Sequence, residues 1–159
     1  KPAFRENGTV TAANSSSISD GAAALVLADE NTAKDYNVRA WICGHASHAQ
    51  EPNLFTTAPV PAAQKLMKRI GWSIDDVDLW EVNEAFAVVP MAFMHEMGIP
   101  REKVNVNGGA IALGHPIGMS GARIVLHLAN ELKRRGGGTG AAALCGGGGQ
   151  GDALIIRVL

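Results

Sequence analysis

The sequence lacks the features of a disulfide scaffold, a membrane protein or a nucleic-acid-binding protein. It holds only two cysteines, Cys43 and Cys145, which is too few for a disulfide framework and typical of a reducing compartment. No apolar run reaches the roughly 18 residues of a bilayer span, and a net charge of −1 argues against a nucleic-acid footprint. We find no signal or transit pattern at the N-terminus, so we expect a cytoplasmic protein without nucleic-acid or membrane partners. Because the chain begins at Lys1 rather than Met, we expect that residues preceded it or were removed.

The chain is instead rich in apolar residues and in glycine. Hydrophobic residues make up 47% and charged residues 18%, which indicates a globular chain of one domain, or one domain plus an extended arm. Many of the 19 glycines fall in two clusters, at 108–121 and 136–151. Each cluster contains one residue with reactive side-chain chemistry, His115 or Cys145.

The periodicity of apolar residues predicts an α/β fold of the order βαβαβαββ. From residue 39 onwards it alternates between strand and helix patterns and ends in two strands that we expect to pair antiparallel. The expected strands are 39–49, 77–82, 104–112, 139–144 and 152–158, and the expected helices are 60–70, 84–97 and 120–135. This order predicts a mixed five-stranded sheet with right-handed crossover helices. Before it, residues 21–28 suggest one more, buried strand, and residues 30–36 a short helix.

Local signals predict several helix boundaries. Gly71 is expected to end the first long helix, and Ser120 is expected to be the N-cap of the last one. Pro90 lies inside the 84–97 pattern, where it removes a backbone donor and predicts a kink or a helix that starts again at that residue.

His115 stands in a glycine-rich turn between an expected strand and an expected helix. Pro116 follows it directly, and Gly114 and Gly118 flank it. The turn after a strand is where open α/β sheets bind ligands, and glycines there allow a ligand to approach the backbone closely. For a single histidine, a structural role in a tight turn is the competing interpretation.

Five blocks of the sequence, in this order, resemble thiolases. They cover essentially the whole chain, and three of them match signature blocks of the C-terminal half of the family. The blocks are Val10-Thr-Ala-Ala-Asn-Ser-Ser-Ser-Ile-Ser-Asp-Gly-Ala-Ala-Ala24, Thr57-Ala-Pro-Val-Pro-Ala62, Asn83-Glu-Ala-Phe86, Gly114-His-Pro-Ile-Gly-Met-Ser-Gly-Ala-Arg123 and Cys145-Gly-Gly-Gly-Gly-Gln-Gly151. The resemblance implies a layered α-β-α fold, with residues 39–159 as the C-terminal domain and residues 1–38 as an arm plus a strand that belong to the loop and N-terminal domains.

The resemblance also implies the chemistry of the site. Thiolases join or cleave a carbon–carbon bond next to a thioester, which needs general bases and donors aimed at developing oxyanions. By this resemblance His115 activates the acyl-accepting thiol and assists the enolate oxygen, and Cys145 is the base that acts on the second substrate. Asn83 would hold a water at one oxyanion site, and the Gly147 amide would serve the other. The competing roles are an inert buried thiol for Cys145 and a helix N-cap for Asn83.

Three further residues match substrate-contacting positions of the family. Ser16 corresponds to the serine that touches the pantetheine arm of coenzyme A, although its residue type alone also suits a turn. Phe55 and Phe86 would form apolar walls. The Phe55-Thr56 pair replaces the Met-Gly of many short-chain thiolases, so the sequence leaves the preferred acyl chain length open.

One part of the family's machinery has no counterpart here. The cysteine that carries the acyl group lies in the N-terminal domain of thiolases, and Cys43 falls in the wrong block to match it. We therefore expect this chain to need the N-terminal half of the enzyme, to act on acyl-CoA as substrate without a separate cofactor, and to be a dimer or tetramer when full length. A metal site is not expected, because His45, His48 and Glu51 fit no closed zinc set.

Two other functions remain open from the sequence. β-Ketoacyl synthases share the fold, but they lack a cysteine in the last glycine run, so Cys145 separates them from thiolases. A non-catalytic CoA-binding or assembly module is the second alternative, and intact catalytic motifs count against it.

Overall fold

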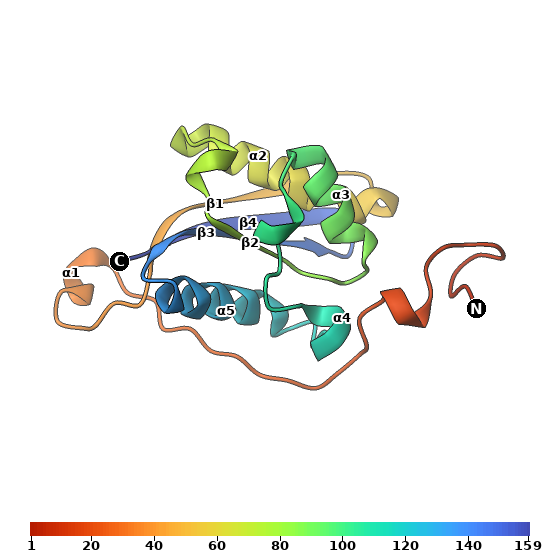
Figure 1. Cartoon of the computed structure of the whole chain (residues 1–159), viewed down its shortest axis with the longest axis horizontal. Coiled ribbons are helices and arrows are strands. Elements are labelled where there is room, and N and C mark those ends of the chain that lie inside the picture. Colours follow the sequence, from red (N-terminus) through yellow and green to blue (C-terminus); the bar gives the residue numbers. More distant parts are fainter.

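The computed structural model describes all residues from Lys1 to Leu159 and shows a mixed four-stranded sheet between two layers of helices (Figure 1). The sheet has the order β1-β4-β3-β2. Its strands are β1 (Trp41–Ala49), β2 (Leu79–Val82), β3 (Gly138–Gly146) and β4 (Gln150–Val158). The expected α/β layered arrangement is therefore confirmed, with one strand fewer than predicted.

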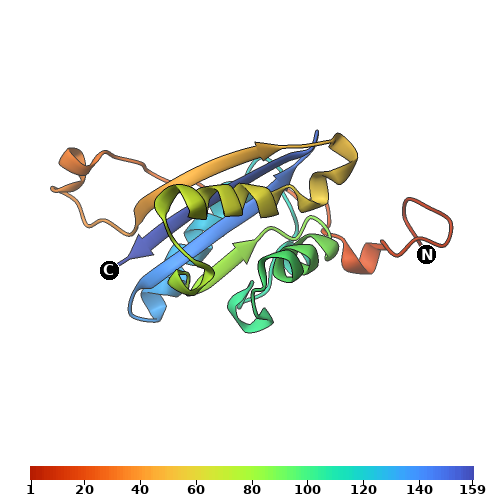
Figure 2. The same ribbon diagram turned by 90° about the horizontal axis from the view of Figure 1, so that it is seen from above.

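The pairing of the strands sets their direction. β4 is antiparallel to both β1 and β3, as the apolar runs at the C-terminus predicted, and β2 is parallel to β3. Val82 at the end of β2 stands opposite Ala143 of β3. The carboxyl ends of β2 and β3 therefore lie at the same edge of the sheet, as Figure 2 shows.

Helices cover both faces of the sheet. One face carries α2 (Pro59–Ile70) and α3 (Val88–Met97), and the other carries α5 (Ser120–Arg134) with the one-turn helix α4 (Ala110–Leu113) beside it (Figure 1). The one-turn helix α1 (Glu30–Ala33) lies apart, beyond one end of the sheet. Gly71, with φ 71°, ends α2 as predicted.

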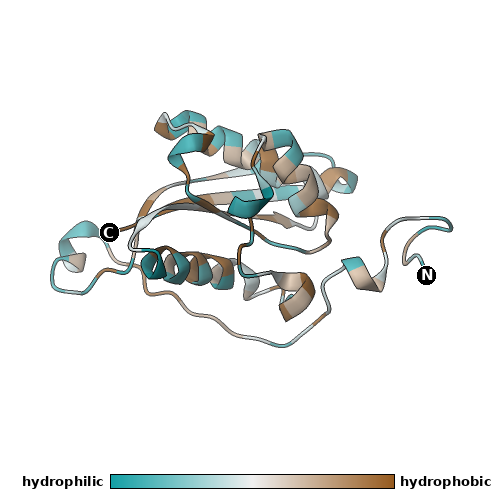
Figure 3. Cartoon of the chain, viewed as in Figure 1, coloured by the Kyte–Doolittle hydropathy of each residue, from teal (hydrophilic) through white to brown (hydrophobic).

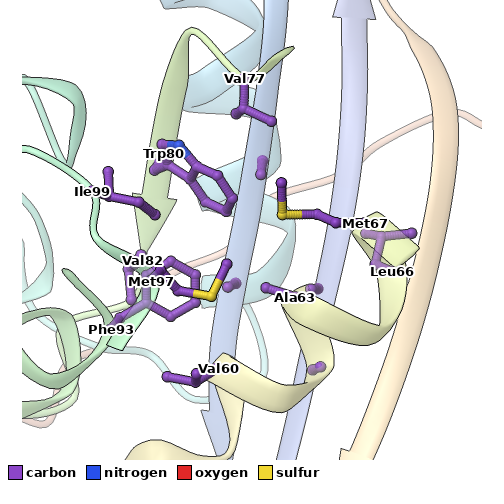
Figure 4. Packing of buried hydrophobic residues seen from close by; sticks show 14 of the residues in the cluster. Val60, Ala63, Leu66, Met67, Val77, Trp80, Val82, Phe93, Met97 and Ile99 are labelled. Atoms are coloured by element: carbon purple, nitrogen blue, oxygen red, sulfur yellow. The ribbon is translucent and has the colours of Figure 1, made fainter. Parts of the chain in front are cut away.

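The larger core fills the space between the sheet and the α2–α3 layer. Trp80 of β2 and Phe93 of α3 lie with their ring centroids 5.5 Å apart, and both side chains are about 1% exposed. Figure 4 shows Leu66 and Met67 of α2 packed over the same face. Burying such side chains is worth about 1.5–3 kcal/mol each, so this layer contributes much of the stability of the domain.

The second core lies under α5. Ile124, Leu128 and Leu132 follow helical spacing and pack against the other face of the sheet. In Figure 3 hydrophilic and hydrophobic residues alternate along α5, as expected for a helix with one buried face. None of the helices combines the length and apolar character that a bilayer crossing would need.

The strand predicted at 104–112 does not form. Val104 makes a single parallel bridge to Trp80, after which Asn105 (φ 47°) and Gly108 (φ 81°) turn the chain away from an extended path. The side chain of Asn105 takes the place of a further strand: its Oδ1 accepts from Val82 N and its Nδ2 donates to Val82 O, both at 2.8 Å. The apolar pattern was misleading because a short helix, α4, uses the second half of it.

The buried strand predicted at 21–28 is also wrong. The segment is extended and mostly exposed, with Val26 99% and Leu27 73% exposed, and it runs past α4 and α5 in Figure 1. A strand needs a neighbour for its backbone groups, and no strand of this chain lies beside the segment.

Two helix starts differ from their predictions. α3 begins at Val88 rather than at residue 84, so Pro90 falls in its first turn, where a missing N–H group breaks no intrahelical bond. The N-cap of α5 is Met119, and Ser120 is its first helical residue. The Ser120 hydroxyl bonds to other partners, described below.

Candidate active site

Asn83 and Cys145 lie at one edge of the sheet, at the ends of neighbouring parallel strands. The backbone N–H group of Asn83 donates to Ala143 O at 2.9 Å, which continues the β2–β3 pairing one residue beyond β2. Cys145 follows Ala143 by two residues in β3. This is the edge at which α/β sheets place their ligands.

The turn between α4 and α5 brings His115 to Asn83. Asn83 Nδ2 lies 3.3 Å from His115 Nε2, and Asn83 is only 1% exposed. No helix follows Asn83 directly, since α3 starts five residues later, so the N-cap alternative is wrong. Both ring nitrogens of His115 have polar partners within the protein, Asn83 and Ser120.

The partners of His115 determine which nitrogen carries the proton. The Ser120 hydroxyl donates to Pro116 O at 3.1 Å and lies 2.6 Å from His115 Nδ1. Because a serine hydroxyl has one proton, Nδ1–H is assigned as the donor to Ser120 Oγ. Nε2 then carries the lone pair, which accepts from Asn83 in this structure and is the place where a reacting proton would bind.

The surroundings of His115 favour its neutral form. Burial, and then the positive charge of Arg123, lower the pKa of His115 below its usual value. A neutral imidazole at neutral pH can act as a general base.

Cys145 is a free thiol and is only 8% exposed. Burial raises the pKa of the Cys145 thiol, and the opposing effect of a backbone N–H group is smaller. Amide N–H groups of the glycines next to Cys145 would favour the thiolate. In this chain the apolar surroundings outweigh them, so the protonated thiol is the favoured form.

The glycine run after Cys145 forms the tight turn between β3 and β4. Gly148 and Gly149 have φ values of 83° and 86°, a region that other residues rarely adopt. A Cβ on Gly149 would also lie 2.2 Å from Gln50 O, so the run allows the chain at residue 50 to approach. Apart from the two residues next to it in the chain, nothing lies within 4 Å of a Cβ built on Gly147. Gly147 is the residue expected to donate to the thioester oxygen.

The N-terminal arm is hydrogen-bonded to the segment that follows Asn83 and to the turn that holds His115. The N–H group and the hydroxyl of Ser16 donate to Ala85 O, at 3.1 and 3.0 Å, and His115 N donates to Ser17 O at 3.0 Å. Ser16 therefore lies beside the Asn83-Glu-Ala-Phe86 segment. Its hydroxyl proton is used within the protein, so a ligand would meet the hydroxyl as an acceptor.

The two phenylalanines expected as walls contact each other. Phe55 lies in the 3-10 helix Pro52–Thr57, and its ring centroid is 6.3 Å from that of Phe86 in an edge-to-face arrangement. Phe4 packs on the other side of Phe86, with a centroid distance of 5.9 Å. Phe4 was not predicted from the sequence, because a single aromatic residue in a polar arm belongs to no pattern.

Glu84 fixes the loop that leads to His115. Its carboxylate accepts from Asn105 Nδ2 at 2.9 Å and from Ile111 N at 3.1 Å. The same carboxylate lies against Gly109, where a Cβ would be 2.5 Å from the Glu84 Cδ atom. Glycine at this position therefore allows the loop to bond to Glu84.

Gly109→Ala is expected to displace this loop. The added methyl group overlaps the Glu84 carboxylate, and such overpacking costs about 1–3 kcal/mol. We expect a lower thermal midpoint and reduced activity in the full-length enzyme. Gly118→Ala is the matched control for the thermal midpoint, since a Cβ there meets nothing within 4 Å. Equal midpoints for the two variants would contradict the assigned role of Gly109.

A buried polar cluster that the sequence analysis missed lies beneath Asn83. Glu81 is 2% exposed, and its Oε1 lies 3.8 Å from His127 Nε2. Burial raises the pKa of Glu81 to about 7, although Arg123 opposes this. Arg123, His127 and Glu131 are spaced four residues apart on α5, so they share one helix face, which was the available signal.

Comparison with known proteins identifies the family. Residues 36–158 match the thiolase C-terminal domain, and residues 1–31 match the thiolase N-terminal domain. The chain belongs to the thiolase family.

Its relatives include proteins named acetyl-CoA acetyltransferase and proteins named 3-ketoacyl-CoA thiolase. The chain is 51% identical to a probable acetyl-CoA acetyltransferase of Mycolicibacterium smegmatis over 99% of this chain and 41% of the relative. The crystal structure of the Bacillus anthracis acetyl-CoA acetyltransferase superposes with a TM-score of 0.97 at 48% identity, covering 100% of this chain and 41% of that one. Human mitochondrial 3-ketoacyl-CoA thiolase in complex with CoA superposes with a TM-score of 0.92 at 42% identity, over 99% and 41%. The chain thus spans about two fifths of the length of these relatives.

Proposed function

We propose that this chain is the C-terminal catalytic portion of a thiolase that condenses two acetyl-CoA molecules to acetoacetyl-CoA, or runs the reverse thiolytic cleavage. The observation that supports this most directly is the Asn83–His115 contact of 3.3 Å, at the edge of the sheet where the strand of Cys145 ends. We further propose that residues 1–38 belong with the loop and N-terminal domains, residues 39–159 form the C-terminal domain, and the full-length enzyme is a homo-oligomer.

His115 is the base for the first half-reaction in this proposal. Its Nε2 takes the proton of the acyl-accepting thiol, and the resulting thiolate attacks the thioester carbonyl. The C–S bond of the thioester breaks, coenzyme A leaves as a thiolate, and Nε2 keeps the proton. In the second half-reaction the protonated Nε2 donates toward the enolate oxygen. Asn83 Nδ2 lies on the same side of the imidazole and can hold a water at this oxyanion site.

Cys145 transfers a proton to or from the α-carbon of the second substrate. In condensation its thiolate removes that proton, and the enolate carbon attacks the acyl group on the enzyme. The bond between the acyl group and the nucleophilic sulfur breaks, and that sulfur takes back the proton of His115 Nε2. In thiolysis the thiol returns a proton to the departing enolate carbon. Because burial raises the pKa of Cys145, the resting chain favours the protonated form that thiolysis uses.

The remaining site residues bind the substrate. The Gly147 N–H group is proposed to donate to the thioester oxygen. Ser16 would contact the pantetheine arm from its place beside Ala85, and the Phe55–Phe86 pair would form an apolar wall. Coenzyme A thioesters are substrates in this scheme, and the scheme uses no further cofactor.

Acetyl-group specificity is supported by the higher identity to acetyl-CoA acetyltransferases, 51% and 48%, than to 3-ketoacyl-CoA thiolase, 42%. The test is thiolysis by the full-length enzyme of acetoacetyl-CoA and of 3-ketohexadecanoyl-CoA. We expect kcat/KM to favour acetoacetyl-CoA by roughly tenfold or more, since a wall such as Phe55 against Phe86 leaves less room for a long chain.

The outcomes of this assay separate the candidate functions. Equal or greater kcat/KM for the long chain would assign the enzyme to the 3-ketoacyl-CoA thiolases. Tight CoA binding without any turnover, and without an effect of Cys145→Ala, would favour a non-catalytic module. Cys43→Ala is the matched control, because Cys43 lies on the edge strand β1, away from the proposed site.

A further inference from the structure

Arg123 is the charged residue near the site that the proposed mechanism does not use. Its Nη2 lies 3.5 Å from Asn83 Oδ1. Its Nε and Nη1 atoms are buried and have no hydrogen-bond partner in the protein. Burying donors without partners costs stability, and the cost is larger when the group is charged. A guanidinium at this position is therefore a poor choice for folding alone.

Asn83 needs a fixed orientation of its amide. The two ends of an asparagine side chain are nearly equal in shape but opposite in hydrogen-bonding role. With Nδ2 toward His115, the amide donates to the lone pair of Nε2. In the reverse orientation Oδ1 would face that lone pair, and Nδ2 would face the guanidinium donors of Arg123.

We propose that Arg123 is a positioning residue for the thiolase reaction, which binds Asn83 Oδ1 and so keeps the Asn83 amide Nδ2 directed at His115. This inference rests on the proposed function. Arg123 acts through Asn83 and through its charge, and it is not itself a catalytic residue.

The charged groups around Arg123 neutralise its positive charge only in part, so that charge also acts on His115. The carboxyl of Glu81 on β2 faces Arg123, and Glu84 follows shortly after β2. On α5, His127 and Glu131 lie on the same side as Arg123. Glu131 is already paired with Arg134 and Arg135. Because burial raises the pKa of Glu81 to about 7, this carboxyl balances Arg123 only in part at neutral pH. The positive charge of Arg123 accordingly lowers the pKa of His115.

The test compares three variants of the full-length enzyme. Arg123→Met removes the charge and the donors but keeps an apolar stem, so it leaves no buried donor without a partner and should fold. Arg123→Lys keeps the charge but loses the planar fork. Lys133→Met is the matched control: it removes a cation from the exposed end of the same helix, about 15 Å away along the axis.

Arg123→Met is expected to reduce kcat roughly 10- to 100-fold with KM within about twofold, since small misplacements of catalytic groups have effects of this size. Without the charge, the pKa of His115 rises, the base is protonated at higher pH, and the acid limb of the kcat/KM profile moves up. Arg123→Lys should restore the acid limb and only part of kcat. Lys133→Met should match the wild type in both. A kcat of Arg123→Met within twofold of the wild type, or an acid limb that does not move, would overturn the inference.

A second readout needs no turnover. The pH dependence of His115 modification by diethyl pyrocarbonate, followed by peptide mass spectrometry, gives the midpoint of His115 titration in each variant. We expect a higher midpoint in Arg123→Met than in the wild type. If the wild type fails to cleave acetoacetyl-CoA, the proposed function fails. If it is active and the midpoints are equal, the role of Arg123 alone is wrong.

Discussion

Replacing Cys145 with serine in the full-length enzyme is expected to abolish condensation while leaving the first acyl transfer nearly intact. A hydroxyl is a far weaker base than a thiolate, and losing a general base costs about 10²- to 10⁴-fold. The first transfer uses His115 as its base and should stay within about threefold of the wild type. Serine is close to cysteine in size, so the tightly packed end of β3 should tolerate it.

His115→Ala provides the contrast. His115 serves both half-reactions in the proposed mechanism, so its loss should slow both by about 10²- to 10⁴-fold. Acyl-enzyme formation from acetyl-CoA is measured by mass spectrometry of the quenched protein, and condensation by the appearance of acetoacetyl-CoA. Equal losses in both steps for Cys145→Ser would refute this division of labour, because Cys145 would then act in both.

The 159-residue chain by itself is expected to show no thiolase activity. No residue in it matches the cysteine that carries the acyl group in thiolases, and covalent catalysis stops without its nucleophile. The measurement is cleavage of acetoacetyl-CoA in the presence of CoA by the purified chain, beside the full-length enzyme at equal molar concentration. A circular dichroism spectrum with the helix and strand content of the structure shows that the chain is folded in the assay.

Turnover by the chain at a rate near that of the full-length enzyme would be the contrary result. The nucleophile would then lie within this sequence, and Cys43 would be the first candidate. Cys43 is half-buried on β1, with its Sγ 3.9 Å from Trp41 O, and is the only other cysteine. The variant Cys43→Ala would decide whether that thiol carries the acyl group.

The elements with strong periodicity were predictable from the sequence. The apolar pattern of α2, the glycine that ends it, and the antiparallel pair β3–β4 all matched the structure closely. The place of Asn83 at the end of a strand was also predicted, but His115 reaches it from the turn after α4 and not from a strand end.

The failures share a physical cause, which is that a pattern of apolar residues does not reveal its partner. Residues 21–28 have the composition of a buried strand, yet they have no strand to pair with and remain exposed. Residues 104–112 look like a strand, but Asn105 adopts a positive φ and its side chain occupies the edge of β2. The buried polar cluster of Glu81, Arg123, His127 and Glu131 was not predicted, because the tertiary fold decides whether a polar residue is buried.

The hydrogen bonds from the N-terminal arm to Ala85 and His115 affect how this protein can be divided. The family boundary falls between residues 31 and 36, but Ser16 and Ser17 bond to Ala85 and His115 across it. A truncation at that boundary would give a piece whose His115 loop has lost its backbone anchor and whose Phe86 ring has lost Phe4. Shortened versions of this protein should therefore be chosen from its spatial contacts and not from the family boundary. A version that keeps residues 1–17 will hold the loop around His115 in place better than one that begins at residue 36.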